Sequence, residues 1–199
     1  SHFRWFWDYA GGMMTDWGVH LLNIAMWAMD PKPPQRVASV GGKWLYQDDA
    51  ETPDTQNTPY DFGAWGLVWA NQACTGHGAE GREHGVAFYG ENGTVIVDAG
   101  KWEVAPEGKK LEREVHPIGE DPELCRVRLV GNFLECCRTR GKTTMNAEVG
   151  HRVTTVAHLG NLALRTGKSV EYDAAKMTIR GNDEANKMVM PEYRSQWTL

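Results

Sequence analysis

The sequence lacks two features that would link it to a membrane or to a nucleic acid. No apolar run approaches the ~20 residues that a membrane-spanning helix needs, and the N-terminal residues do not read as a signal peptide. Lysine and arginine number 21 against 26 aspartates and glutamates, a net charge of −5, and they form no long basic stretch. Because phosphate binding requires a basic surface, we expect neither nucleic acid nor membrane as a partner.

Cysteine is also scarce, with four residues and no CxxC pair. Adjacent Cys136 and Cys137 are poorly placed to bond to each other. We therefore expect reduced, mostly buried thiols and a cytoplasmic protein.

The two common phosphate-binding motifs are absent. No strand pattern is followed by GxGxxG and a helix, and no GxxxxGK[ST] occurs. The glycine-rich residues 76–81 lack the following helix that would complete a phosphate site. We therefore expect no Rossmann domain within residues 1–199.

Tryptophan, by contrast, is abundant, with nine residues spread along the chain. Indole rings suit cores, subunit interfaces and the faces of sugars. We expect most of the nine in cores and interfaces.

The segment that begins at Gly11 and Gly12 has apolar residues at helical spacing. This pattern predicts a helix that ends at about Met29, with Thr15 or Asp16 as its cap. The prolines of residues 30–34 stop it.

Alternating patterns predict strands at 36–46 and 61–72, and the polar, proline-containing residues 47–59 predict a loop. Tight turns between successive strands indicate an antiparallel sheet. Trp65, Leu67 and Trp69 share one face, either an oligomer interface or a surface for the chain's own helices. Further short strands are predicted at 85–89, 94–98 and 101–105.

Helices follow the strands. Helical spacing predicts helices at 122–140 and 147–166 and a short one at 183–186, before an extended tail at 191–199. The order predicts a single α+β domain over residues 1–199, with a mostly antiparallel, open-faced sheet packed on helices.

Three polar residues project from one stripe of the first predicted helix. Asp16 and His20 are four residues apart, one helical turn, and Asn23 lies a turn later. A carboxylate beside an imidazole suits proton transfer, but an i,i+4 pair is also a common helix-surface contact or a satisfied buried histidine. Two ligands without a third do not predict a metal site. Spacing alone leaves the alternatives open.

The same segment resembles a known motif. In the C-terminal domain of the Gfo/Idh/MocA oxidoreductases, the family of glucose–fructose oxidoreductase and inositol dehydrogenase, a glycine pair precedes DxGxHxxD. Here the glycine pair, Asp16, Gly18 and His20 match, and Asn23 replaces the last aspartate. Further similarity to the family lies at residues 90–98, 132–142 and 150–168.

The resemblance implies a domain like the C-terminal domain of glyceraldehyde-3-phosphate dehydrogenase. It implies that a Rossmann domain holding NAD or NADP, and a catalytic lysine, lie upstream of residue 1. His20 would exchange a proton as hydride moves, Asp16 would orient the substrate or His20, and Gly12 would contact the cofactor. The chain alone is then expected to be inactive.

Further residues are expected at a substrate site. Arg4 and Trp5 are candidates to bind a sugar, although a packed N-terminal strand explains them equally well. His151 resembles a family position, with core or interface packing as its alternative. Trp17 and Asn23, on the first predicted helix, are also expected to bind the substrate.

The predicted partners are a sugar or polyol substrate and a second copy of the chain, bound through the sheet face. The predicted reaction is hydride transfer to or from a sugar, polyol or related cyclic alcohol. NAD-assisted glycoside hydrolysis and a stand-alone carbohydrate-binding or assembly module remain the alternatives.

Overall fold

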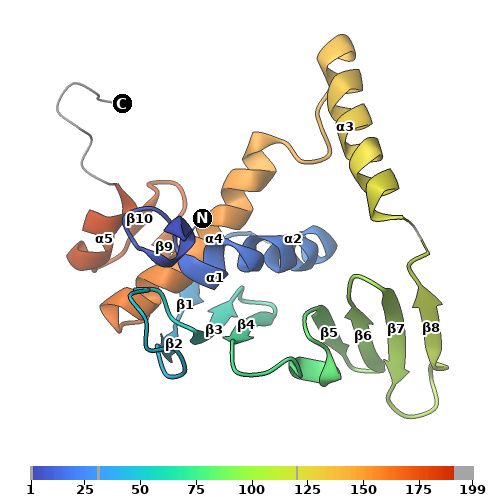
Figure 1. Ribbon diagram of the computed structural model, residues 1–199, viewed down its shortest axis with the longest axis horizontal. Coiled ribbons are helices and arrows are strands. Elements are labelled where there is room, and N and C mark those ends of the chain that lie inside the picture. Colours follow the sequence, from blue (N-terminus) through green and yellow to red (C-terminus); the bar gives the residue numbers. More distant parts are fainter. Residues whose placement is uncertain (1, 31, 120, 191–199) are drawn as a thin grey trace. The chain divides into compact units, whose positions relative to one another are not determined.

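The computed structural model describes residues 2–30, 32–119 and 121–190, without the side chain of Pro122. They form two compact units, and each is described by itself. The first contains residues 1–74 and 152–199, and the second contains residues 75–151 (Figure 1).

The first unit contains an antiparallel sheet built around β3 (Thr55–Asp61). One edge of β3 pairs with β4 (Gly66–Gln72), and the other pairs with β1 (Arg36–Val37) and β2 (Val40–Gly42). Burial alternates along β3 and β4, so one face of the sheet is covered and the other is exposed.

The prediction of a loop over 47–59 is wrong for its last residues, because β3 begins at Thr55. The misleading signal is Pro59, which lies inside β3 opposite Val68. Proline has no N–H to donate to a neighbouring strand. β1 and β2 are interrupted at residues 38–39, opposite Pro59 and Thr58, so the predicted strand at 36–46 forms only as two short pieces.

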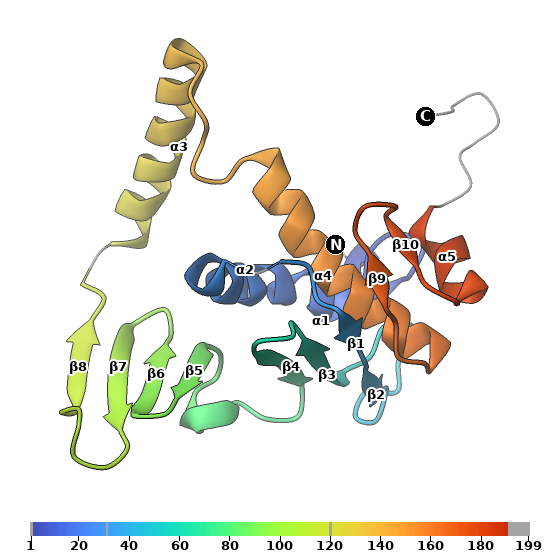
Figure 2. The same ribbon diagram turned by 180° about the vertical axis from the view of Figure 1, so that it is seen from behind.

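Three helices lie on the covered face of this sheet (Figures 1 and 2). They are α1 (Gly12–Thr15), α2 (Trp17–Met29) and α4 (Ala147–Thr166), which begins in the second unit. Helix α2 lies over this face, and a Cβ added to Gly18 would lie 3.7 Å from the Trp69 ring, an ordinary van der Waals contact. Trp69 is therefore 7% exposed under the chain's own helix. Of the three residues predicted to share a face, Trp69 is buried, and Trp65 and Leu67 are half-buried. The opposite face carries exposed Val40 and Val68.

The C-terminal part of the first unit is a hairpin and a helix. β9 (Tyr172–Asp173) pairs with β10 (Thr178–Ile179), and α5 (Asp183–Val189) follows. The Asn182 side chain caps the N-terminus of α5 by accepting a hydrogen bond from the Ala185 N–H. The helix begins at the predicted residue and continues three residues beyond the predicted end at 186. The predicted extended tail, 191–199, lies outside the described residues.

The second unit contains four antiparallel strands in the order β5-β6-β7-β8, followed by α3 (Pro122–Thr139). The three strands predicted here are confirmed within one residue, and β8 was not predicted. Arg82 pairs with the carboxylates of Asp98 and Glu103, which ties the loop before β5 to the sheet. The strands are β5 (Val86–Gly90), β6 (Gly93–Val97), β7 (Lys101–Pro106) and β8 (Glu114–Pro117).

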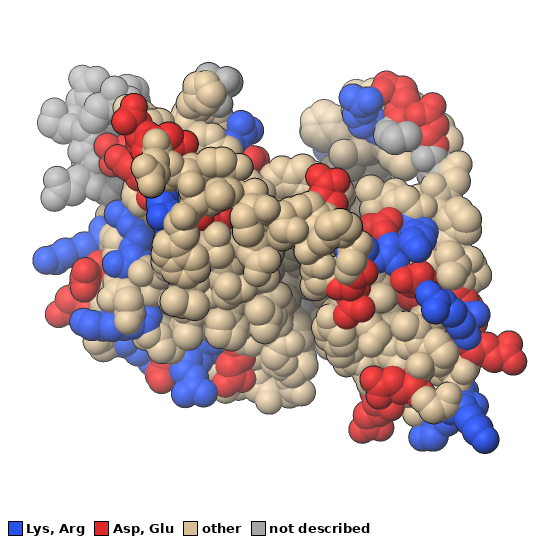
Figure 3. Space-filling view, turned by 60° about the horizontal axis from the view of Figure 1, so that its bottom comes forward, with Lys and Arg blue, Asp and Glu red and all other residues tan. Residues whose placement is uncertain are grey.

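The four cysteines are free, but the prediction that most are buried is wrong. Cys136 is half-buried, and the other three are exposed. Among the described residues, no helix is long and apolar enough to cross a membrane. On the face in Figure 3, basic and acidic side chains are interspersed over the described residues, with no extended basic patch.

Candidate functional site

The predicted first helix is interrupted at Asp16. Its backbone angles, φ −91° and ψ −84°, are not helical, so Asp16 ends α1 and precedes α2. The carboxylate therefore lies at the N-terminus of α2, where the aligned backbone dipoles favour negative charge.

Asp16 pairs with Arg4, not with His20. Arg4 Nε lies 2.7 Å from the Asp16 carboxylate, and about a third of each side chain is exposed. The Nε–H is not aimed at an acceptor, so the contact is an ion pair rather than an aligned hydrogen bond. The Arg4 guanidinium also lies 5.6 Å from the ring centre of Phe3 and 6.0 Å from that of Trp5, within cation–π range.

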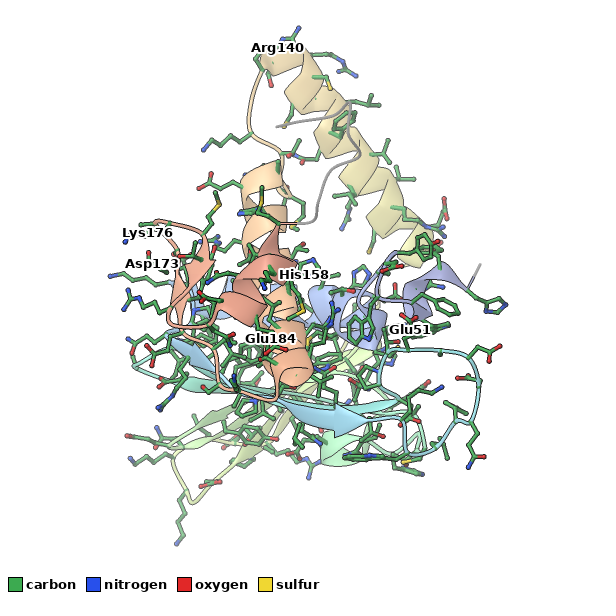
Figure 4. All side chains as sticks on the ribbon, turned by 90° about the vertical axis from the view of Figure 1, so that its left-hand side faces the viewer. Glu51, Arg140, His158, Asp173, Lys176 and Glu184 are labelled. Carbon is green, nitrogen blue, oxygen red and sulfur yellow. The ribbon has the colours of Figure 1, made fainter. Side chains whose placement is uncertain are left out.

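The aromatic N-terminal segment is fixed by a neighbouring loop, where Figure 4 shows Glu51. The Trp5 carbonyl accepts hydrogen bonds from the N–H groups of Glu51 (2.8 Å) and Thr52 (3.2 Å). The Trp7 N–H donates to the Glu51 carboxylate at 2.8 Å, and Arg165 lies 4.8 Å from the Trp7 ring centre. The segment is irregular with a single 3₁₀ turn, so the alternative of a packed N-terminal strand is wrong.

A buried carboxylate organises that loop. Asp54 accepts hydrogen bonds from the backbone N–H groups of Trp44, Leu45 and Tyr46 at 3.2, 2.8 and 2.9 Å. Burial by itself raises the pKa of Asp54. Hydrogen bonds from these N–H groups and from the Thr55 hydroxyl together lower the pKa by more, so the pKa lies below its ordinary value. The loop is thus held in one conformation beside the aromatic segment.

The other predicted site residues occupy different environments. His20 and Trp17 are exposed on α2, and Asn23 is half-buried one turn further along. Arg4, Asp16 and the Trp5 ring thus bring together a cation, an anion and an aromatic face, groups that bind hydroxyls and pyranose faces. His20 adds an exposed imidazole on α2. No cluster of three metal-ligating side chains occurs in the described part of the chain. His151 is exposed near the start of α4 and belongs to the second unit.

Gly12 has a structural reason to be glycine. Its φ is +66°, and an added Cβ would lie 2.6 Å from the Thr52 side chain. Gly12 is buried against Thr52 rather than on an open surface. Its predicted cofactor contact stays a prediction.

Sequence reasoning missed three residues that shape this site: Glu51, Asp54 and Asn161. Glu51 and Asp54 lie in a polar segment where no spacing rule distinguishes one carboxylate from another. Asn161 is 4% exposed on α4. A lone amide among the apolar residues 159–163 of a predicted helix is the sequence signal that points to it, because a buried polar group needs a partner.

Comparisons with known proteins identify the family. Residues 1–96 match the GFO/IDH/MocA C-terminal domain, and residues 106–199 match the oxidoreductase family, C-terminal alpha/beta domain. The chain belongs to the Gfo/Idh/MocA oxidoreductases. It corresponds to their C-terminal domain, which confirms the predicted family and the α+β fold.

Solved structures share the fold of this Gfo/Idh/MocA domain at low identity. A levoglucosan dehydrogenase in complex with NADH and levoglucosan matches at TM-score 0.65 and 14% identity, over 85% of this chain and 52% of its own. The WlbA dehydrogenase of Bordetella pertussis, in complex with NADH and UDP-GlcNAcA, matches at TM-score 0.58 and 12% identity, over 87% of this chain and 49% of its own. An Agrobacterium radiobacter oxidoreductase in complex with NAD⁺, L-tartaric acid and magnesium matches at TM-score 0.61 and 13% identity, over 81% of this chain and 49% of its own.

This chain therefore spans about half the length of these structures. A comparison with curated proteins gave no match.

Proposed function

We propose that this domain is the substrate-binding half of an NAD(P)-dependent oxidoreductase that transfers hydride to or from a sugar, polyol or related cyclic alcohol. The observation that carries the proposal is the DxGxH segment, which presents the Arg4–Asp16 pair at the N-terminus of α2 and exposed His20 at the end of its first turn. The sugar ligands of two structural neighbours support this substrate class.

In this proposal the cofactor supplies or accepts the hydride and is held by a Rossmann domain. The described residues provide no dinucleotide-binding loop. Gly12 packs against Thr52, and no described strand precedes the glycine pair as it would in a strand–loop–helix phosphate site. The chain itself binds the substrate, orients the reacting carbinol and exchanges a proton with it.

Each site residue then has a defined task. The Arg4–Asp16 pair and the Trp5 ring bind hydroxyls and one sugar face, which orients the reacting carbinol. His20 takes the hydroxyl proton during oxidation and returns it during reduction. Asn23 and Trp17 lie on α2 with His20 and remain predicted substrate contacts. His151 remains a predicted substrate contact, and homo-oligomerisation through the sheet face remains a predicted assembly.

A stand-alone carbohydrate-binding module is the second candidate, favoured by the aromatic segment around Arg4. Such a module would bind sugar without needing His20 as a proton carrier. Kinetics in a protein that joins this chain to a Rossmann domain separate the two.

In that protein, His20→Ala and Asp16→Ala are each expected to lower kcat about 100-fold, because the loss of a proton-transfer group, or of a carboxylate that orients the reacting carbinol, has about that cost. The Kd of NAD(H), measured by calorimetry, should stay unchanged. His77→Ala, an exposed histidine of the second unit, is the matched control and should leave kcat as it was. Unchanged turnover in both site variants would contradict the proposed function.

A further inference from the structure

The glycine pair of the DxGxH segment is held by a residue 150 positions away. Asn161, on α4, donates a hydrogen bond from Nδ2 to the Gly11 carbonyl at 2.8 Å. The Gly11 N–H donates to the Thr15 hydroxyl at 3.0 Å. Both backbone polar groups of Gly11 are therefore bound by side chains, which fixes where α1 begins.

The contact requires close approach at both elements. A Cβ added to Gly11 would lie 2.5 Å from Asn161 Nδ2 and 2.7 Å from the Thr15 side chain. A Cβ added to Gly160 would lie 2.5 Å from the Tyr60 hydroxyl and 2.8 Å from Met14 Cε. Glycine on each side thus permits α4 to lie against α1 at the distance that this hydrogen bond needs.

Stability alone does not account for an amide at this position. Asn161 is 4% exposed, and within the described part of the chain its Oδ1 has no hydrogen-bond partner. Burying an unpaired amide oxygen costs free energy that an apolar side chain of similar size would not. What the amide provides, and an apolar side chain would not, is the directional hydrogen bond to the Gly11 carbonyl.

We propose that Asn161 is a positioning residue for the DxGxH segment. Through Gly11 it sets the start of α1, and α1 leads within one turn to Asp16 and then to His20 on α2. This role in turnover rests on the proposed function, whereas its structural part can be tested without it.

The structural part is tested in this chain by NMR. In Asn161→Asp, at a pH high enough to ionise the buried carboxyl group, a carboxylate oxygen replaces the donor and faces the Gly11 carbonyl. The Gly11 ¹³C′ and Gly12 ¹⁵N resonances should then move, with changes extending to His20. Asn182→Asp is the matched control, because the Asn182 oxygen is the capping acceptor and aspartate keeps it. If Asn161→Asp does not fold, Asn161→Ala removes the donor without adding charge. Gly11 and Gly12 resonances that stay in place would overturn the proposal.

The catalytic part is tested in the protein that carries a Rossmann domain. Asn161→Asp and Asn161→Ala should lower kcat about 10- to 100-fold at unchanged NAD(H) affinity, because a small displacement of a catalytic group has such a cost. Val156→Ala, a buried packing residue of the same helix, should lower the Tm but leave kcat within about twofold. Equal losses of kcat in both kinds of variant would overturn the positioning role. Full turnover of the His20→Ala and Asp16→Ala variants would instead refute the proposed function, and the NMR result would still decide the structural part.

Discussion

At the scale of single residues, the partner of Asp16 differs from the one that its spacing predicts. The i,i+4 rule joins side chains only within one continuous helix, and the backbone at Asp16 is not helical. The carboxylate pairs instead with Arg4, 12 residues upstream, and no hydrogen bond or ion pair between Asp16 and His20 is present. His20 is thereby left exposed for a substrate, which is the state that the proposed proton transfer needs.

Asp54 gives a prediction at the same scale. Asp54→Asn should lower the free energy of unfolding by about 2 kcal/mol at pH 7, because the amide cannot accept all of the hydrogen bonds that the carboxylate accepts. Urea denaturation measures the loss, and Asp49→Asn, an exposed aspartate of the same loop, is the control.

The effect of Asp54 should depend on pH. Because its pKa is lowered in the folded state, its contribution is fully present above the ordinary value of 3.8 and is lost as the pH falls through the folded-state pKa. The difference between wild type and Asp54→Asn should therefore be constant from pH 5 to 7 and shrink below about pH 4. A difference that grows on acidification would contradict the assignment.

At the scale of elements, sequence patterns correctly predicted the helices and hairpins whose formation depends mainly on residues close together in the sequence. The long helices α3 and α4 and the hairpin β5–β6 formed where expected, since apolar periodicity and turn residues specify them locally. The first residues of β3 were predicted as loop because Pro59 is unfavourable in a strand. β3 accommodates Pro59 because the neighbouring strand is interrupted opposite it, between β1 and β2.

Helix α4 offers two glycines with opposite expected behaviour. Gly160→Ala should lower the free energy of unfolding by about 1–3 kcal/mol, because its Cβ would overlap the Tyr60 hydroxyl and Met14. Gly150→Ala, where no atom lies within 4 Å of the added Cβ, should leave stability unchanged or raise it by up to about 1 kcal/mol. Thermal unfolding followed by circular dichroism compares them. Equal effects would show that close packing of α4 does not set the requirement at Gly160.

At the scale of the whole molecule, two compact units share one continuous helix, and the chain corresponds to about half of its structural neighbours. We predict that the isolated chain has no measurable affinity for NAD⁺ or NADH by calorimetry, because its described residues contain no glycine-rich strand–turn–helix to hold a pyrophosphate. Joining it to a Rossmann domain should restore binding. Micromolar binding by the isolated chain would contradict this division of tasks.

The sequence by itself determined the family, the α+β class, the long helices and the DxGxH segment, because motifs and periodicity are local properties of the chain. Tertiary structure decided the rest of the site: Arg4 as the partner of Asp16, Glu51 as the anchor of Trp7, and Asn161 as the donor to Gly11. These contacts join residues 12 to 150 positions apart. No spacing rule specifies them, since they exist only once the helices pack on the sheet.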